Sequence, residues 1–260
     1  MVKFPHMLLA IDIGNSNAVF GLFEGNKLVQ VWRCETSQLK IPRIKNKIDK
    51  VIIASVVPSI DQGFKAKIIK QFSVIPYFVT AQNIPIIKIK LKKLKEIGAD
   101  RVVDALAAYK IYGGPVIVVD FGTATTFDVI TAKGEYLGGA IAPGITMARD
   151  ALHAKTAKLP QIELKAPKRV IGNDTVSAMQ SGLVYGYAGM VEGMVGKIKS
   201  QIPNPKSQII QKSKIQNTKI IVIATGGLAP LVCKYTTVID RIDTELTLKG
   251  LRIIKDALAF

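Results

Sequence analysis

A short polar turn follows the first apolar segment of the chain. Leu8–Ile11 is apolar, and Asp12-Ile13-Gly14-Asn15-Ser16-Asn17 comes directly after it. Gly14 would let such a turn approach a phosphate closely, and the amide and hydroxyl side chains could donate hydrogen bonds to phosphate oxygens. Asp12 could hold Mg²⁺ directly or through water. These are groups that phosphoryl transfer requires, although an Asx turn that merely closes a hairpin would look the same.

The same plan returns 108 residues later, where Val116–Val119 leads into Asp120-Phe121-Gly122-Thr123-Ala124-Thr125-Thr126. We expect the three threonines to offer hydroxyls to polyphosphate oxygens, and Asp120 to ligate a cation. Two copies of one strand–turn–strand unit favour a functional turn over a simple Asx turn. They also predict a duplicated α/β chain, with domains at 1–114 and 115–260.

Two further motifs carry polar or glycine residues at element boundaries. Gly98-Ala99-Asp100-Arg101 opens a segment with helical spacing that runs to Tyr112. Asp100 could complement the helix dipole, and Arg101 could neutralise a substrate carboxylate. Thr225-Gly226-Gly227 follows an apolar run. It is typical both of a turn that lets a flat base lie against backbone and of an ordinary strand-to-helix turn.

Several other chemistries lack their sequence signatures. The chain has no Gly-x-x-x-x-Gly-Lys-Ser/Thr sequence, and no Gly-x-Gly-x-x-Gly follows a predicted strand. The two histidines, His6 and His153, do not pair with cysteines at metal-binding spacing, which argues against zinc. No nucleophile elbow supports Ser–His–Asp hydrolysis.

The composition is that of a folded protein with an unusual charge. The 260 residues are 48% hydrophobic, the formal net charge is +17, and the pI is about 9.8. No apolar run reaches the ~20 residues that a bilayer crossing needs. Two cysteines form no disulfide framework, which favours a reducing compartment. The charge is compatible with a nucleic-acid or membrane-surface partner, and equally with lysines scattered over a solvated surface.

Apolar periodicity and turn residues predict alternating strands and helices around these motifs. Predicted strands include a hairpin at 7–23 and the segments 27–33, 51–57, 74–79, 116–119, 127–131, 136–141 and 219–224. Predicted helices lie at 60–71, 98–112, 145–154, 173–199 and 246–258, and 200–218 is predicted to be a surface loop.

In this order along the chain, the motifs resemble those of the type III pantothenate kinases. Beyond those above, the resemblance includes Gly172-Asn173-Asp174-Thr175, Gln180-Ser181-Gly182, Thr225-Gly226-Gly227-Leu228 and Leu246-Thr247-Leu248-Lys249-Gly250-Leu251. It runs nearly end to end, from Met7 to Leu258. Each motif alone is ambiguous, whereas the ordered set is specific.

The resemblance implies an α/β fold of duplicated actin-like (ribonuclease H-like) ATPase domains, with mixed sheets flanked by helices. It implies transfer of the ATP γ-phosphate to the 4′-hydroxyl of pantothenate, the first step of coenzyme A synthesis. The cofactors would be ATP, Mg²⁺ and a monovalent cation, K⁺ or NH₄⁺. The protein would be a cytoplasmic homodimer without nucleic-acid or membrane partners.

The resemblance also implies roles for individual residues. Asp100 would be the base that accepts the hydroxyl proton. Contacts to ATP would come from Asp12, Ile13, Gly14, Asn15, Ser16, Asn17, Thr123, Gly226 and Gly227. Contacts to pantothenate would come from Gly98, Ala99, Arg101 and Thr175. Asp12 would place Mg²⁺, and Asp120 would bind the monovalent cation.

The chain departs from the family pattern in places. Lys88–Ile97 is rich in lysine and lacks the Asn-Pro that the family usually has before Gly98. Asp104 stands where Asn is common and adds an acid one helical turn from Asp100. The alternative hypothesis is a transcription-accessory or nucleic-acid-binding protein of the same family. It has the net charge in its favour, but no helix-turn-helix, zinc-finger or RNA-binding aromatic motif.

Overall fold

The computed structural model describes residues 6–84, 87–202 and 219–258, which form two compact units. The first unit comprises the described residues up to Lys110 and those from Glu245 onward; the second spans Ile111–Thr244. The chain passes between the units after Lys110 and after Thr244, so the C-terminal helix groups with the first unit. The domains at 1–114 and 115–260 stay a prediction. Most of the loop predicted at 200–218 lies outside the described residues.

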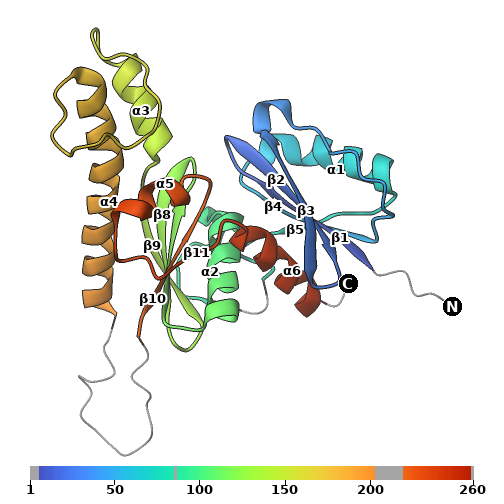
Figure 1. The fold of residues 1–260 in the computed structure, drawn as a ribbon. Coiled ribbons are helices and arrows are strands. Elements are labelled where there is room, and N and C mark those ends of the chain that lie inside the picture. The colour runs from blue at the N-terminus through green and yellow to red at the C-terminus, as the bar shows by residue number, and fades with distance from the viewer. Residues whose placement is uncertain (1–5, 85–86, 203–218, 259–260) are drawn as a thin grey trace, which may run out of the picture. The chain divides into compact units, whose positions relative to one another are not determined.

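Five strands of the first unit form a mixed sheet in the order β3-β2-β1-β4-β5 (Figure 1). β1 pairs antiparallel with β2 and parallel with β4, β2 pairs antiparallel with β3, and β4 pairs parallel with β5. The predicted hairpin and third strand are confirmed, whereas β5 is shorter than expected. The strands are β1 (Met7–Ile13), β2 (Asn17–Glu24), β3 (Lys27–Glu35), β4 (Lys50–Ser55) and β5 (Tyr77–Val79).

The second unit repeats this arrangement strand for strand. Its strands run in the order β11-β10-β7-β8-β9, with β7–β8 and β8–β9 antiparallel and β7–β10 and β10–β11 parallel. The internal repeat inferred from sequence is therefore a repeat of topology. The strands are β7 (Val116–Phe121), β8 (Ala124–Ile130), β9 (Glu135–Pro143), β10 (Ile221–Thr225) and β11 (Arg241–Ile242). One further short strand is β6 (Lys88–Ile89).

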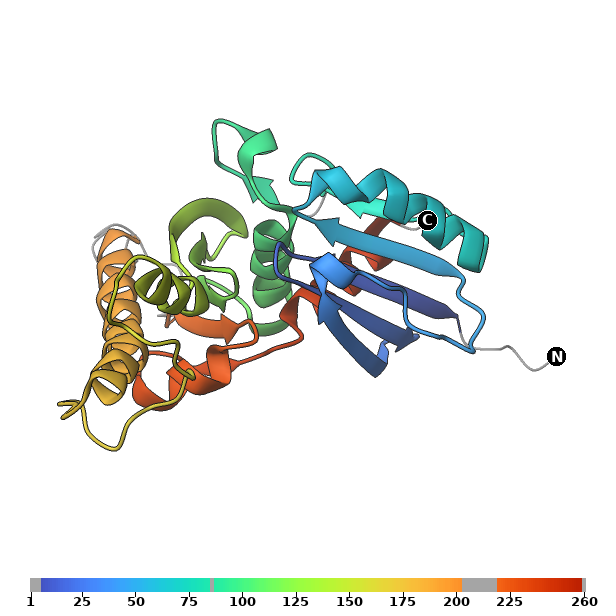
Figure 2. The same cartoon turned by 90° about the horizontal axis from the view of Figure 1, so that it is seen from above.

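Helices cover both sheets and supply much of each core. In the first unit α1 (Pro58–Phe72) packs Phe64 and Ile68 against one sheet face, a position that Figures 1 and 2 both show. In the second unit the long α4 contributes Leu183, Val191 and Val195 to the core on one face of its sheet. The other helices are α2 (Ala99–Tyr112), α3 (Ile145–Ala154), α4 (Thr175–Gln201), α5 (Ala229–Val232) and α6 (Leu246–Leu258).

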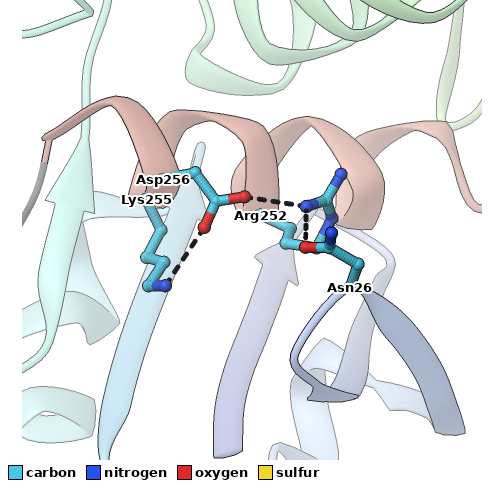
Figure 3. Close-up of polar contacts among 4 residues, drawn as sticks. All are labelled: Asn26, Arg252, Lys255 and Asp256. Atoms are coloured by element: carbon cyan, nitrogen blue, oxygen red, sulfur yellow. Dashed lines mark hydrogen bonds and ion pairs between the residues drawn. The ribbon is translucent and has the colours of Figure 1, made fainter. Parts of the chain in front are cut away.

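Close packing explains why α6 belongs to the first unit. A Cβ built on Gly250 would lie 2.6 Å from Val103 Cγ1 and 2.7 Å from the Val103 carbonyl oxygen, so α6 touches the backbone of α2. Leu248 of α6 packs directly on Gly21 of β2. Arg252 adds a polar connection, because its Nη1 donates to Asn26 Oδ1 and Asp256 Oδ2, each at 2.7 Å (Figure 3).

A hydrogen bond joins the two ends of the second unit. Tyr112 Oη donates to Asp243 Oδ2 at 2.8 Å, and these residues lie next to the two points where the chain passes between units. Burial raises the pKa of Tyr112 to about 12, and the hydrogen bond to Asp243 acts in the same direction. None of the helices in the described residues is long and apolar enough to cross a bilayer.

The close contact at Gly250 predicts that even one added methyl group there lowers the free energy of unfolding. Gly250→Ala should lower the free energy of unfolding by about 1–3 kcal/mol, since the new methyl group overlaps α2. Gly63→Ala on α1 is the matched control, because a Cβ there meets nothing within 4 Å. It should stabilise the protein by about 0.5–1 kcal/mol, the helix preference for Ala over Gly. Urea denaturation of both variants measures this, and equal effects would contradict the packing argument.

The raised pKa of Tyr112 predicts a pH-dependent stability. Below pH 10 the tyrosine is protonated in both states, so its contribution is fully present. Between pH 10 and about 12 the unfolded state releases the proton first, so the free energy of unfolding falls with rising pH. Urea denaturation from pH 8 upward should show a steeper fall for the wild type than for Tyr112→Phe. Parallel curves would contradict the prediction.

Candidate functional site

The first polar turn lies between β1 and β2 at the carboxyl end of β1. The amide of Gly14 donates to the Asn17 carbonyl at 3.0 Å, which closes the turn. Asn15, Ser16 and Asn17 are exposed, and Asp12 is half-buried at the end of the strand. The turn thus presents its polar side chains to solvent from a rigid hairpin, which suits an anion site.

A residue that the sequence analysis did not single out holds this turn from the side. Thr36 follows β3 and begins a short 3₁₀ helix, Thr36–Gln38. Its Oγ1 donates to the Gly14 carbonyl at 2.7 Å, and its amide donates to the Ser16 carbonyl at 3.0 Å. The sequence offers one signal for this role: Thr36 lies 108 residues before Gly144, which contacts the equivalent turn of the second unit.

Asp100 reaches the same edge of the first sheet through Gly98. The position that a Cβ of Gly98 would take is occupied by Asp100 Oδ1 and lies 3.4 Å from Val56 Cγ1. Val56 follows β4, and its amide donates to the Ile13 carbonyl at 3.0 Å, directly before Gly14. The start of α2 therefore lies against the residues that lead into the first turn. The carboxyl ends of adjacent parallel strands are the usual place for ligands in α/β sheets.

The local geometry of Asp100 orients its carboxylate. Asp100 is half-buried in the first turn of α2, and its Oδ1 accepts a hydrogen bond from the Arg101 amide at 2.7 Å. Arg101 is half-buried as well, whereas Ala99 is buried and could meet a ligand only through its backbone. Asp104, the extra acid, is buried on the same helix.

The second unit holds Asp120 between two glycine turns. A Cβ on Gly122 would lie 3.1 Å from Asp120 Oδ2, and a Cβ on Gly226 would overlap Asp120 Oδ1. Gly226 has φ +89°, which favours glycine, and it begins the turn from β10 to α5. Since Thr225 and Asp120 are partners in the parallel β7–β10 register, both turns meet at one sheet edge.

Only part of the predicted threonine cluster faces this edge. Thr123 is half-buried in the turn, but Thr125 and Thr126 are buried within β8. Thr126 Oγ1 donates to Asp128 Oδ2 at 3.0 Å, so its hydroxyl serves the core. The expectation that three hydroxyls would face phosphate was wrong for these two, because they pair in the β-ladder behind the bend.

Gly144 supports the second turn much as Thr36 supports the first. Gly144 follows β9 and precedes α3, and a Cβ on it would collide with the Thr123 carbonyl oxygen and lie 2.7 Å from that of Gly122. Gly144 stands 108 residues after Thr36, the same offset that relates Asp12 to Asp120. Both residues therefore occupy one position of the repeat.

Thr175 comes from a different element. It is the exposed first residue of α4, whose N-cap is Asp174. The Ser177 amide donates to Asp174 Oδ1 at 2.8 Å and holds the pKa of Asp174 below its usual value. No hydrogen bond within the described ranges joins Thr175 to the Asp120 turn.

The acids suit a metal ion that shares its coordination with a ligand. Among the described residues, no group of three or more His, Cys, Asp and Glu side chains is arranged to hold a metal. An ion at Asp12 or Asp120 would complete its shell with phosphate oxygens and water. Mg²⁺ in phosphoryl-transfer sites commonly does this, because it binds one or two carboxylates and keeps several waters.

Comparisons with known proteins agree with one another. The sequence model of the type III pantothenate kinase family matches residues 8–197. A type III pantothenate kinase of Moorella thermoacetica is 44% identical over 95% of this chain and 98% of its own length. A second, from Paramagnetospirillum magneticum, is 43% identical over 94% and 95%.

Solved structures share the fold at low identity. A Campylobacter jejuni protein assigned by name to the Baf family of transcriptional activators has a TM-score of 0.61 at 21% identity, covering 96% of this chain and 98% of its own. The MreB 5 protein of Spiroplasma citri, bound to AMPPNP, has a TM-score of 0.51 at 10% identity, covering 98% and 97%. At such identities the likeness shows a common fold, as the resemblance to actin-like ATPases predicts.

Proposed function

Because this chain belongs to the type III pantothenate kinase family, we propose that it transfers the γ-phosphate of ATP to the 4′-hydroxyl of pantothenate, the first step of coenzyme A synthesis. The observation that carries the proposal is in the first unit. There Asp100 and the Gly14–Asn17 turn lie at one edge of the sheet, linked through Gly98, Val56 and Ile13. A base for an alcohol and a cradle for phosphate are the two parts that such a transfer requires.

Asp100 is proposed as the base. An alcohol is too weak an acid to ionise beforehand, so a carboxylate must orient it and accept its proton as the phosphoryl group moves. The Arg101 amide fixes one carboxylate oxygen, Oδ1. This hydrogen bond orients the carboxylate that is proposed to accept the substrate proton.

The remaining candidate residues divide by the ligand they would contact. Backbone amides and side chains of the first turn would cradle the phosphates of ATP, and the glycine turn after β10 would leave room for the rest of the nucleotide. ATP contacts are proposed for Asp12, Ile13, Gly14, Asn15, Ser16, Asn17, Thr123, Gly226 and Gly227. Pantothenate contacts are proposed for Gly98, Ala99, Arg101 and Thr175, with the Arg101 guanidinium suited to the pantothenate carboxylate.

Two cations complete the proposal. Mg²⁺ would be placed by Asp12 and would neutralise phosphate charge. A monovalent cation, K⁺ or NH₄⁺, would bind at Asp120. Its support is the geometry at Asp120, whose carboxylate lies against Gly122 and Gly226 at the sheet edge.

A cytoplasmic homodimer is proposed as the working form. Gly182, Gly186, Gly189 and Gly193 share an exposed face of α4, and a Cβ on any of them would meet nothing within 4 Å. Such a face lets a second helix approach closely. Both cysteines are free thiols, which suits a reducing compartment. The nucleic-acid alternative is not adopted, since the family match explains the ordered motifs and the net charge alone does not.

The substrate assignment predicts a specific turnover. The purified protein with MgATP should release ADP when pantothenate is added, and faster with K⁺ or NH₄⁺ than without either. Coupled ADP detection, with glycerol and glucose as control acceptors, measures this. Phosphorylation of another alcohol but not of pantothenate would refute the assignment, and equal rates with and without the cation would refute the monovalent site.

The base assignment predicts a loss in kcat at one position. Asp100→Asn keeps an acceptor for the Arg101 amide but loses the proton acceptor, so kcat should fall by about 10²–10⁴-fold while the KM for ATP changes little. Asp256→Asn is the control: an exposed carboxylate of the same unit, paired with Arg252 and Lys255. Near-normal kcat in Asp100→Asn would exclude Asp100 as the base.

A further inference from the structure

Three carbonyl groups of the Gly14–Asn17 turn accept hydrogen bonds from within the first unit. Thr36 supplies two of the donors: its hydroxyl to the Gly14 carbonyl and its amide to the Ser16 carbonyl, at 2.7 and 3.0 Å. The Asn17 carbonyl accepts from the Gly14 amide. Three carbonyls of this turn are therefore satisfied within the hairpin and by the residue after β3.

These contacts fix the direction of the amides. A trans peptide is planar, and its C=O and N–H groups point in opposite directions. When the Gly14 carbonyl points to Thr36, the Asn15 amide points away from Thr36. The same holds for the Ser16 carbonyl and the Asn17 amide. Thr36 thus fixes the orientation of two peptide groups of the turn, and with them the directions of the Asn15 and Asn17 amides.

The second unit supports this interpretation independently. Gly144 occupies the repeat position of Thr36, and it contacts the turn that contains Gly122 and Thr123. After each third strand, the chain returns to the first turn of its own unit. In the second unit the contact is made by bare backbone, because a side chain would collide with the turn. In the first unit a hydroxyl makes it.

Apart from its contacts with the turn, Thr36 begins the 3₁₀ helix, where its carbonyl accepts from the Leu39 amide at 3.2 Å. It is only half-buried, and it is not among the residues of the first hydrophobic core. Its neighbour Ser37 is exposed and donates to Glu35 Oε2 at 3.3 Å, not to the turn. Ser37 is therefore a matched control for a hydroxyl at this place.

We propose that Thr36 is the positioning residue that holds the Gly14–Asn17 turn in the conformation that binds the phosphates of ATP. The inference rests on the proposed kinase function and deepens it, because it assigns a determinant of nucleotide affinity outside the motifs. Thr36 acts through the turn and does not itself contact the ligand.

The test separates phosphate binding from stability. Thr36→Val keeps the shape and the backbone amide but removes the hydroxyl donor, and Thr36→Ser restores it. Thr36→Val should raise the Kd and KM for MgATP by about five- to tenfold, the usual effect of losing one neutral hydrogen bond. The KM for pantothenate and the Kd for adenosine, which has no phosphate, should stay unchanged. Thr36→Ser and Ser37→Ala should bind MgATP like the wild type.

The outcomes distinguish this proposal from the proposed function. Three outcomes would each overturn the role of Thr36. Thr36→Val could bind MgATP as tightly as the wild type, or lose equal affinity for adenosine and MgATP. Thr36→Ser could fail to restore the affinity for MgATP. Calorimetric titration measures binding without turnover, and thermal denaturation reports whether each variant is folded. A wild type that binds MgATP but does not phosphorylate pantothenate would refute the substrate assignment, while the titration of Thr36→Val would still decide the role of Thr36.

Discussion

The central strand of each sheet pairs with a hairpin partner on one side and a parallel strand on the other, and the site residues depend on this arrangement. In the first unit β1 pairs antiparallel with β2 and parallel with β4. The hairpin turn and the carboxyl end of the parallel strand must then lie at one edge. β7, between β8 and β10, is under the same constraint. Strand register, set by buried apolar side chains, thereby fixes where polar groups meet.

Glycine provides the second constraint, because it allows carboxylates to fold back against the backbone. Asp100 occupies the space beside Gly98, and Asp120 lies between Gly122 and Gly226. In each case a methyl group would displace the carboxylate or the neighbouring chain. At Gly98, Gly122 and Gly226 the acid and its glycine are thus one structural unit, whether or not they are close in sequence.

The sequence predicts the long elements and the repeat well, for physical reasons that also explain the misses. β1, β7 and α6 have enough residues for a clear apolar period, and the Asp-x-Gly turns mark the hairpins. β11 and α5 are two and four residues long, too short for any period. The docking of α6 on the first unit depends on Gly250 meeting Val103, a contact with no local signal. Thr36 carries no motif of its own. Its hydrogen bonds to Gly14 and Ser16 depend on how β3 pairs with β2, which local sequence does not reveal.

Duplication explains how one scaffold can carry two turns of unlike chemistry. Topology, turn position and the return of the chain after the third strand are common to both units, and all of them are properties of backbone and register. Side chains at the bend are under no such constraint. The first turn is therefore able to present the exposed amide and hydroxyl groups of Asn15, Ser16 and Asn17. The second buries Thr125 and Thr126 and leaves Asp120 half-buried. Hydrogen-bond donors for anions and an oxygen ligand for a cation are complementary requirements of a polyphosphate. Substitutions at equivalent positions of one hairpin are enough to produce either kind of group.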